Sequence, residues 1–281
     1  MILLFLFCMV LFVLTVVFAV RGTVLDVIVH DLMFPYVNLR GNIIMPDIAA
    51  SKEFKLTLVD TSQHGLFVTS SSTIHYLVKG PIEDVDTLVF YCHGNSGTIN
   101  EWQHVIEEMV RVSPKGTTII THDYRGYGKS YAYDNPTPKN VVDDAAQLLS
   151  MCYKHIRPKK VVLYGRSIGA AVAVHLAALE EIKIDKVCLE TPFLGTKFVA
   201  VPLVSFIAER WECMHALTAC KANISTILCR NDNIINYEKT CHLLSTIKDI
   251  DIYTYDGQHN EVMSAPYWHH MYSKLFLYEN L

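Results

Sequence analysis

Twenty residues without a charged side chain open the sequence. Met1–Val20 contains Thr15 as its only hydroxyl, and Arg21 ends the run. Twenty helical residues span about 30 Å, the thickness of the hydrocarbon core of a bilayer. The pattern therefore predicts a transmembrane helix over residues 1–21. A cleaved signal peptide is the alternative, because residues 17–19 offer a small-residue cleavage site, although no basic residue precedes the apolar run.

Beyond this run the pattern changes twice. Residues 22–53 mix apolar and polar positions around two prolines and predict a tether. Two β-rich segments follow at 54–60 and 73–78, with a polar turn region at 61–65 between them. Short apolar runs then alternate with helical periodicity. The runs predict strands at 87–92, 117–121, 161–164, 186–189, 226–229 and 250–255. The periodicities predict helices at 99–111, 141–155 and 168–179.

Short, fully apolar strands between helices predict one α/β domain over residues 54–281, with a mostly parallel sheet that has helices on both faces. The chain has 281 residues, of which 51% are hydrophobic, so it is long enough for one such core plus an appendage. Its net charge of −4 gives no basic surface for nucleic acid, and we expect no such partner. Ligands of such sheets bind at the carboxyl ends of the strands, where the chemistry is expected.

Charge and cysteine usage bear on the compartment. Arg21 and Arg40 follow the apolar run and no basic residue precedes it, so the positive-inside rule predicts a cytosolic domain on a single-pass anchor. Apolar strand-like runs hold three cysteines, where free thiols act as small hydrophobes. These are Cys92, Cys188 and Cys229. A sequon at residues 223–225 keeps a luminal or secreted domain as the alternative. No paired cysteine or histidine spacing predicts a metal, and we expect no cofactor.

One five-residue motif stands where a strand-like run meets a helix rich in small residues. Gly165-Arg166-Ser167-Ile168-Gly169 has the strand–turn–helix context of a nucleophile elbow, which predicts Ser167 as a nucleophile. An oxyanion hole needs two backbone N–H donors. We expect one from Ile168 and the other from Asn95, in the loop after the strand at 87–92. His93 precedes the serine in the chain and is predicted to be a buried brace of that loop.

The base is predicted by position, since the chain holds thirteen histidines. His259 follows the last predicted strand, which suits the order of nucleophile, acid and base found with such an elbow. Imidazole has an ordinary pKa near 6.5, so histidine can act as a base at neutral pH. By contrast, His175 lies on the elbow helix and is predicted to be a packing residue, and His269 and His270 are predicted to be surface residues.

Four motifs in chain order resemble one family. They are His93-Gly94-Asn95, Asp123-Tyr124-Arg125-Gly126-Tyr127-Gly128-Lys129-Ser130, Gly165-Arg166-Ser167-Ile168-Gly169 and Gly257-Gln258-His259-Asn260. Together they resemble the membrane-associated α/β-hydrolase subfamily of serine hydrolases, which includes protein depalmitoylases and lysophospholipid and monoacylglycerol lipases. The resemblance covers residues 54–278 and implies the α/β-hydrolase fold. It also implies that Asp123 is structural.

The resemblance implies Asp232 as the acid, because this residue follows a strand and precedes a helix where the family places its carboxylate. The family usually has a glycine three residues earlier and a proline four residues later, and here these positions are Cys229 and Asn236. Glu190, at the end of the predicted strand 186–189, is the alternative acid. Catalytic triads recur with different acids, so both carboxylates stay open at this point.

These residues predict a membrane-anchored serine hydrolase that cleaves carboxylic ester or thioester bonds of a lipid or lipidated-protein substrate. Residues 192–222 contain the apolar stretch 198–207 and are predicted to form a small cap over an acyl pocket, with an ordinary helix packed on the sheet as the equal alternative. A catalytically silent hydrolase fold that binds a lipid or a partner is the second hypothesis, and a serine peptidase is the third.

Overall fold

The structure is a computed structural model that describes residues 34, 63–132, 134–200, 211 and 213–261. The predicted anchor at 1–21, the strand at 54–60 and the tether, apart from Phe34, lie outside the described residues. No helix within the described residues is both long and apolar enough to cross a membrane.

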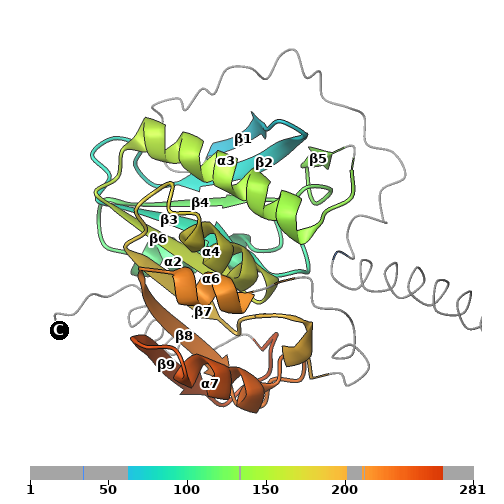
Figure 1. The fold of residues 1–281 in the computed structure, drawn as a ribbon. Coiled ribbons are helices and arrows are strands. Elements are labelled where there is room, and N and C mark those ends of the chain that lie inside the picture. Colours follow the sequence, from blue (N-terminus) through green and yellow to red (C-terminus); the bar gives the residue numbers. More distant parts are fainter. Residues whose placement is uncertain (1–33, 35–62, 133, 201–210, 212, 262–281) are drawn as a thin grey trace, which may run out of the picture.

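The described strands form a single twisted sheet (Figure 1). Its path runs β1-β2-β4-β3-β6-β7-β8-β9, and the short β5 pairs with β2. Neighbours from β4 to β9 are parallel, whereas β1–β2 and β2–β4 are antiparallel. The bounds are β1 (Gln63–Val68), β2 (Ser72–Lys79), β3 (Thr87–Cys92), β4 (Thr117–His122), β5 (Tyr131–Ala132), β6 (Lys160–Arg166), β7 (Lys186–Glu190), β8 (Asn223–Cys229) and β9 (Ile250–Tyr255). The predicted mostly parallel sheet is confirmed.

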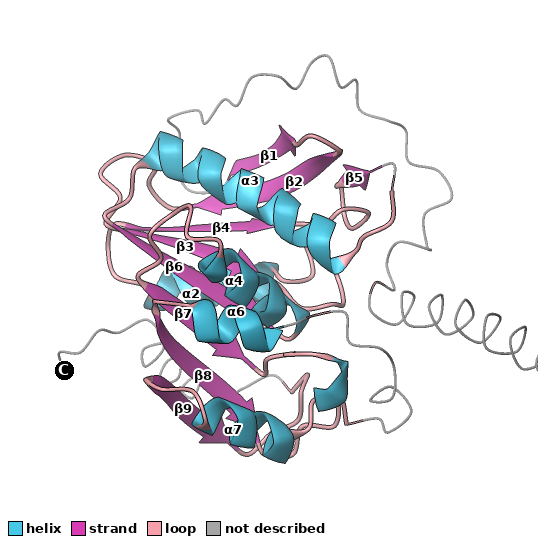
Figure 2. Cartoon of the chain, in the orientation of Figure 1, coloured by secondary structure: helices cyan, strands magenta, loops and turns pink. Residues whose placement is uncertain are grey.

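Helices cover both faces of this sheet, as Figure 2 shows. Their bounds are α2 (Gln103–Val112), α3 (Pro138–Ile156), α4 (Ile168–Ala178), α6 (Cys213–Ala219) and α7 (Tyr237–Ser245), with a 3₁₀ turn η2 (Thr196–Phe198). Alternate side chains of β3 explain the two layers. Leu88 and Phe90 pack in the core shared with α3, α4 and α6, while Val89 and Tyr91 pack in the core beneath α2. A strand buried on both faces must be apolar throughout, which is why its sequence was a continuous hydrophobic run.

The order of the strands reverses between β3 and β6. From β3 the chain continues to β4 on one side, whereas β6 pairs with β3 on the other side. Loops that leave the carboxyl ends of two such strands diverge and leave a crevice, where α/β sheets bind their ligands. The predicted nucleophile follows β6 and the predicted oxyanion loop follows β3, so both lie at this switch point.

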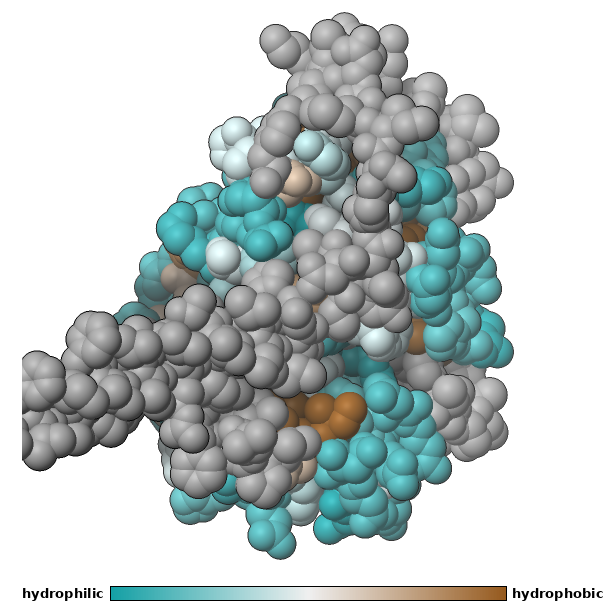
Figure 3. Space-filling view, turned by 90° about the vertical axis from the view of Figure 1, so that its right-hand side faces the viewer, coloured by the Kyte–Doolittle hydropathy of each residue, from teal (hydrophilic) through white to brown (hydrophobic). Residues whose placement is uncertain are grey.

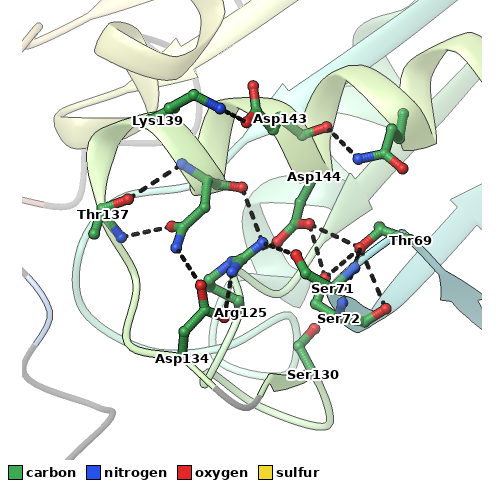
Figure 4. A network of polar contacts seen from close by, with 12 residues as sticks. Thr69, Ser71, Ser72, Arg125, Ser130, Asp134, Thr137, Lys139, Asp143 and Asp144 are labelled. Carbon is green, nitrogen blue, oxygen red and sulfur yellow. Dashed lines mark hydrogen bonds and ion pairs between the residues drawn. The ribbon is translucent and has the colours of Figure 1, made fainter.

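The loop after β4 is fixed by a buried polar network (Figure 4). Arg125 is 1% exposed and pairs with Asp144 of α3 at 2.8 Å and with Asp134 at 2.7 Å. The second oxygen of Asp144 accepts hydrogen bonds from the hydroxyls of Thr69 and Ser72, in the β1–β2 turn, at 3.0 and 2.7 Å. A buried charge needs such partners to be tolerated, and these partners tie three segments of the chain together.

One prediction needs correction. Residues 61–65 were predicted as a turn, but Gln63, His64 and Gly65 belong to β1, and the turn lies at 69–72. Their polarity is compatible with a strand because β1 pairs with β2 through its backbone at the end of the described sheet.

The cap predicted at residues 192–222 stays a prediction. Within it, Cys213, Ala216 and Leu217 of helix α6 are buried in the main core and α6 packs on α4, as expected for the alternative of an ordinary packed helix. Residues 201–210 of the predicted cap lie outside the described residues.

Candidate active site

Ser167 occupies a strained turn between β6 and α4. Its φ and ψ are 52° and −120°, a combination that side-chain-bearing residues rarely adopt, and the residue is the N-cap of α4. A Cβ on Gly165 would lie 2.4 Å from the carbonyl oxygen of Gly169, and a Cβ on Gly169 would lie 2.0 Å from that of Cys92. Both glycines are therefore required for the close approach of α4 to β6 and β3. This is the geometry of a nucleophile elbow.

His259 joins the elbow to the loop after β8. Its Nε2 lies 2.9 Å from Ser167 Oγ, and its Nδ1 lies 2.8 Å from Asp232 Oδ2. A carboxylate can only accept, so Nδ1 carries the proton and Nε2 is left to accept the serine hydroxyl proton. Ser167 is partly exposed, whereas the side chains of His259 and Asp232 are buried. The structure thus brings together the three residues predicted for the triad.

The position of Asp232 is set by the start of the next segment. Its Oδ1 accepts the backbone N–H groups of Ile234 and Ile235 at 2.8 and 2.7 Å, which leaves Oδ2 for the histidine. Asn236, where the family pattern has proline, caps α7 by accepting the N–H of Lys239 at 2.9 Å. The departure from the pattern therefore does not disturb the loop that presents the carboxylate.

Glu190, the alternative acid, has other partners. It is completely buried at the end of β7, where it forms an ion pair with Arg166 and accepts the hydroxyl of Tyr164 at 2.7 Å. Its hydrogen bonds thus lead to the elbow and to β6, and the imidazole of His259 is bound by Asp232 instead. Of the two carboxylates, only Asp232 lies where it can orient the base.

The loop after β3 lies against the elbow. A Cβ on Gly94 would lie 3.8 Å from the Cβ of Ser167, so this backbone passes directly beside the nucleophile. Ile168 is the first residue of α4, and its N–H has no partner within the helix. The side chain of Asn95 is held by the hydroxyl of Tyr127 at 2.9 Å. Ile168 thus directly follows Ser167, and Asn95 follows Gly94, whose backbone passes beside the serine; their role as oxyanion donors remains a prediction.

Buried side chains brace this loop from behind. His93 is completely buried and donates from Nδ1 to the carbonyl of Gly94 at 2.7 Å. Burial lowers the pKa of His93, which keeps the ring neutral. Asp123 accepts the N–H of Ile99 at 2.7 Å and bonds His75 at 2.7 Å. Burial opposes ionisation of Asp123, yet these hydrogen bonds and the nearby histidines lower its pKa overall. His93 and Asp123 thus have the structural roles that were predicted.

Sequence reasoning missed two residues of this region. Arg166 and Trp102 are in contact, with the guanidinium 5.4 Å from the centre of the indole ring. Trp102 donates to the carbonyl of Ser96 at 2.7 Å and so holds the oxyanion loop. The signal available in the sequence was Arg166, a charged residue in the variable position of the elbow motif, together with Glu190, a carboxylate at the end of the next strand.

Two other kinds of site, a metal centre and a reactive thiol, were considered in the described part of the chain. No group of three or more histidine, cysteine or carboxylate side chains there could hold a metal ion. The seven described cysteines are free thiols. Burial raises the pKa of Cys188 and of Cys229 to about 12, so both stay protonated at neutral pH and are poor nucleophiles.

Known proteins resemble the chain in sequence and in fold. A segment is 31% identical over 113 residues to lysophosphatidylserine lipase ABHD12 of Danio rerio, and it spans 39% of this chain and 29% of that protein. The uncharacterized protein YfhR of Escherichia coli K12 is 23% identical over 230 residues, 78% of this chain and 77% of YfhR. The Pyrococcus furiosus esterase Pf2001 superposes with a TM-score of 0.63 at 14% identity, over 83% of this chain and 94% of the esterase.

The family model described as serine aminopeptidase, S33 (Hydrolase_4) matches residues 83–234, more than half of the chain. This segment runs from the strand before the oxyanion loop, through the elbow, to the loop that carries Asp232. The Pyrococcus esterase and other solved hydrolases share the same architecture. The chain therefore belongs to the Hydrolase_4 family of serine hydrolases and has the α/β-hydrolase fold.

Proposed function

We propose that this protein is a membrane-anchored serine hydrolase that cleaves carboxylic ester or thioester bonds of lipid-bearing substrates. One observation carries the proposal: a single imidazole, that of His259, bridges the elbow serine at 2.9 Å and a buried carboxylate at 2.8 Å. Such a bridge activates a serine hydroxyl, which is a weak nucleophile without a base.

The reaction follows from the direction of these hydrogen bonds. Ser167 Oγ attacks the acyl carbon while His259 Nε2 takes its proton, and Asp232 stabilises the imidazolium that forms. The imidazolium then protonates the alcohol or thiol that leaves, and an acyl-serine remains. Water, deprotonated by the same imidazole, releases the acid and restores the serine. The backbone amides of Ile168 and Asn95 bind the oxyanion, where each donor contributes on the order of 3–4 kcal/mol.

The lipid-bearing substrate class is proposed from the sequence, the surface and a relative. The uncharged segment Met1–Val20 would place the enzyme at a bilayer. Figure 3 views the side on which the parallel strands end, and a hydrophobic area, coloured brown, is exposed there among described residues that are mostly hydrophilic. Ile234, next to the acid loop, is 37% exposed. The ABHD12 relative is named as a lysophosphatidylserine lipase. These features favour an acyl chain as the ligand.

The name of the family raises aminopeptidase activity as a second candidate. An aminopeptidase must bind the positive amino terminus of a peptide, which calls for a carboxylate near the serine. Among the described residues, the two carboxylates in the hydrogen-bond network of this site already have partners: Asp232 binds His259 and two amides, and Glu190 binds Arg166 and Tyr164. This pairing favours an uncharged acyl substrate over a peptide.

A fluorophosphonate probe tests the proposal directly. We expect it to label the full-length protein, and we expect Ser167→Ala to abolish labelling with the fold unchanged. Ser96→Ala is the matched control, because Ser96 is an exposed serine on the neighbouring loop. Wild-type protein that has not been exposed to the probe would then be assayed on lysophospholipids, monoacylglycerols, palmitoylated peptides and aminoacyl anilides. Undiminished labelling of Ser167→Ala, or a folded wild type that is not labelled, would refute the proposal that the protein is a serine hydrolase. Turnover of the anilides alone would refute the substrate class.

A further inference from the structure

Arg166 has partners in three other segments of the site. Its Nη1 forms the ion pair with Glu190 of β7, and its Nη2 donates to the backbone carbonyl of His259 at 2.7 Å. Its guanidinium lies over the ring of Trp102. Arg166 itself directly precedes Ser167. Arg166 is 7% exposed and Glu190 is fully buried, so the guanidinium and this carboxylate are bound by protein groups and not by water.

These contacts attach His259 to the elbow at two points. The first is the hydrogen bond between the imidazole and Ser167 Oγ, and the second is the hydrogen bond between the carbonyl of His259 and Arg166. Only the first point takes part in bond making. Once Ser167 Oγ carries the acyl group it has no proton to donate, so the first attachment is lost. The second attachment involves no reacting atom and persists.

We propose that Arg166 is a positioning residue that holds the base for deacylation, the half-reaction in which the serine no longer holds it. This inference rests on the catalytic triad proposed above. In that half-reaction a bond forms between the water oxygen and the acyl carbon, and the bond from the acyl carbon to Ser167 Oγ breaks. His259 takes the proton from water and returns it to the serine. The imidazole must therefore keep its place while its bond to Ser167 is absent.

The ion pair with Glu190 explains how Arg166 keeps its direction. Arginine offers donors in a rigid planar fork, so binding of one edge by a carboxylate fixes where the other edge points. Tyr164 fixes the second oxygen of Glu190 at 2.7 Å, and Trp102 limits movement out of the guanidinium plane. Lysine in this place would keep the charge without spanning both acceptors.

The two half-reactions can be measured separately with p-nitrophenyl acetate. Release of nitrophenol with enzyme in excess gives the acylation rate constant, and the decay of the acetyl-enzyme by intact-protein mass spectrometry gives the deacylation rate constant. The first variant is the double change Arg166→Met with Glu190→Gln, because removal of Arg166 alone would leave a buried, unpaired carboxylate. The second is Arg166→Lys. Arg230→Gln is the matched control, since Arg230 pairs with Asp256 and lies over Tyr237 but is half exposed.

We expect deacylation to slow by about 10²-fold in both Arg166 variants, the scale of a 1 Å misplacement of a catalytic group. Acylation should slow much less, KM should change little, and Arg230→Gln should behave as wild type. Equal slowing of both steps, or wild-type deacylation in a folded variant, would overturn the inference. If neither Arg166 variant folds, the role of Arg166 is to stabilise the fold alone, and the inference is overturned as well. A wild type that forms no acetyl-enzyme would instead refute the proposed function.

Discussion

The substitution Asp232→Asn tests the acid with little change of shape. Asparagine can keep an oxygen on the amides of Ile234 and Ile235, which now hold Oδ1 of Asp232. Its NH₂ group would then face Nδ1 of His259, which must accept instead of donate. The imidazole is thereby forced into the tautomer that carries its proton on Nε2 and cannot take the proton of Ser167.

The expected loss can be worked from the geometry. With His259 Nδ1 and Asp232 Oδ2 2.8 Å apart, the two charges of the imidazolium–carboxylate pair are centred about 4 Å from each other. At an effective dielectric constant of about 20 this attraction is about 4 kcal/mol. Its loss from the transition state lowers kcat by about 10³-fold. The wrong tautomer adds to this, and the same change in serine proteases costs about 10⁴-fold.

The assay is steady-state hydrolysis of a soluble p-nitrophenyl ester, with circular dichroism on each variant. We expect Asp232→Asn to keep its spectrum and its KM and to lose about 10³- to 10⁴-fold in kcat. Glu190→Gln should lose far less, because Glu190 binds Arg166 and Tyr164 and not the imidazole. A folded Asp232→Asn protein with near-normal turnover would refute the assignment, and the reverse ranking of the two variants would move the acid to Glu190.

Two further outcomes are expected. Deletion of residues 1–21 should release the protein from membranes with turnover of soluble esters intact, and continued sedimentation with membranes would show a second attachment surface. Burial lowers the pKa of His122 to about 3, and neither ring nitrogen has a hydrogen-bond partner among the described residues. The unfolded chain therefore binds more protons below pH 6.5, and stability falls as the pH drops, by about 2 kcal/mol between pH 7 and pH 5 from this group. His122→Phe should flatten that decline in urea titrations at the two pH values, and an unchanged slope would contradict it.

Much of the fold could be predicted from strands that are buried on both faces of the sheet. The runs at 87–92 and 186–189 became β3 and β7, because central strands that are covered on both faces are nearly continuous in hydrophobic residues. The whole of β1 was missed. Its polar first half, Gln63–Gly65, is held by pairing with β2, more than ten residues away in the chain, which polarity alone does not reveal.

The candidate site also has parts that the sequence predicts and parts that it does not. Ser167 and His259 stand in local contexts that a sequence displays, a strand–turn–helix and a loop after the last strand. The link from Arg166 to the carbonyl of His259 joins residues 93 positions apart through a backbone atom. No residue type is required at the accepting end of such a bond, so the sequence carries no sign of it. The choice between Asp232 and Glu190 likewise needed the positions of the side chains.

The contact between α4 and β3 has a consequence for the adaptability of the enzyme. At Gly169 the helix rests on the carbonyl oxygens of Cys92 and His93, where even one added carbon would lie within 2.6 Å of backbone. A substitution changes side-chain atoms and leaves the main-chain atoms as they are. A contact made by main-chain atoms therefore cannot be adjusted by mutation. Directed evolution of such a protein would find neutral or useful changes among the side chains around the active site and almost none at the contact between α4 and β3. The nucleophile and its oxyanion loop would be inherited as one fixed unit while substrate preference drifts around them.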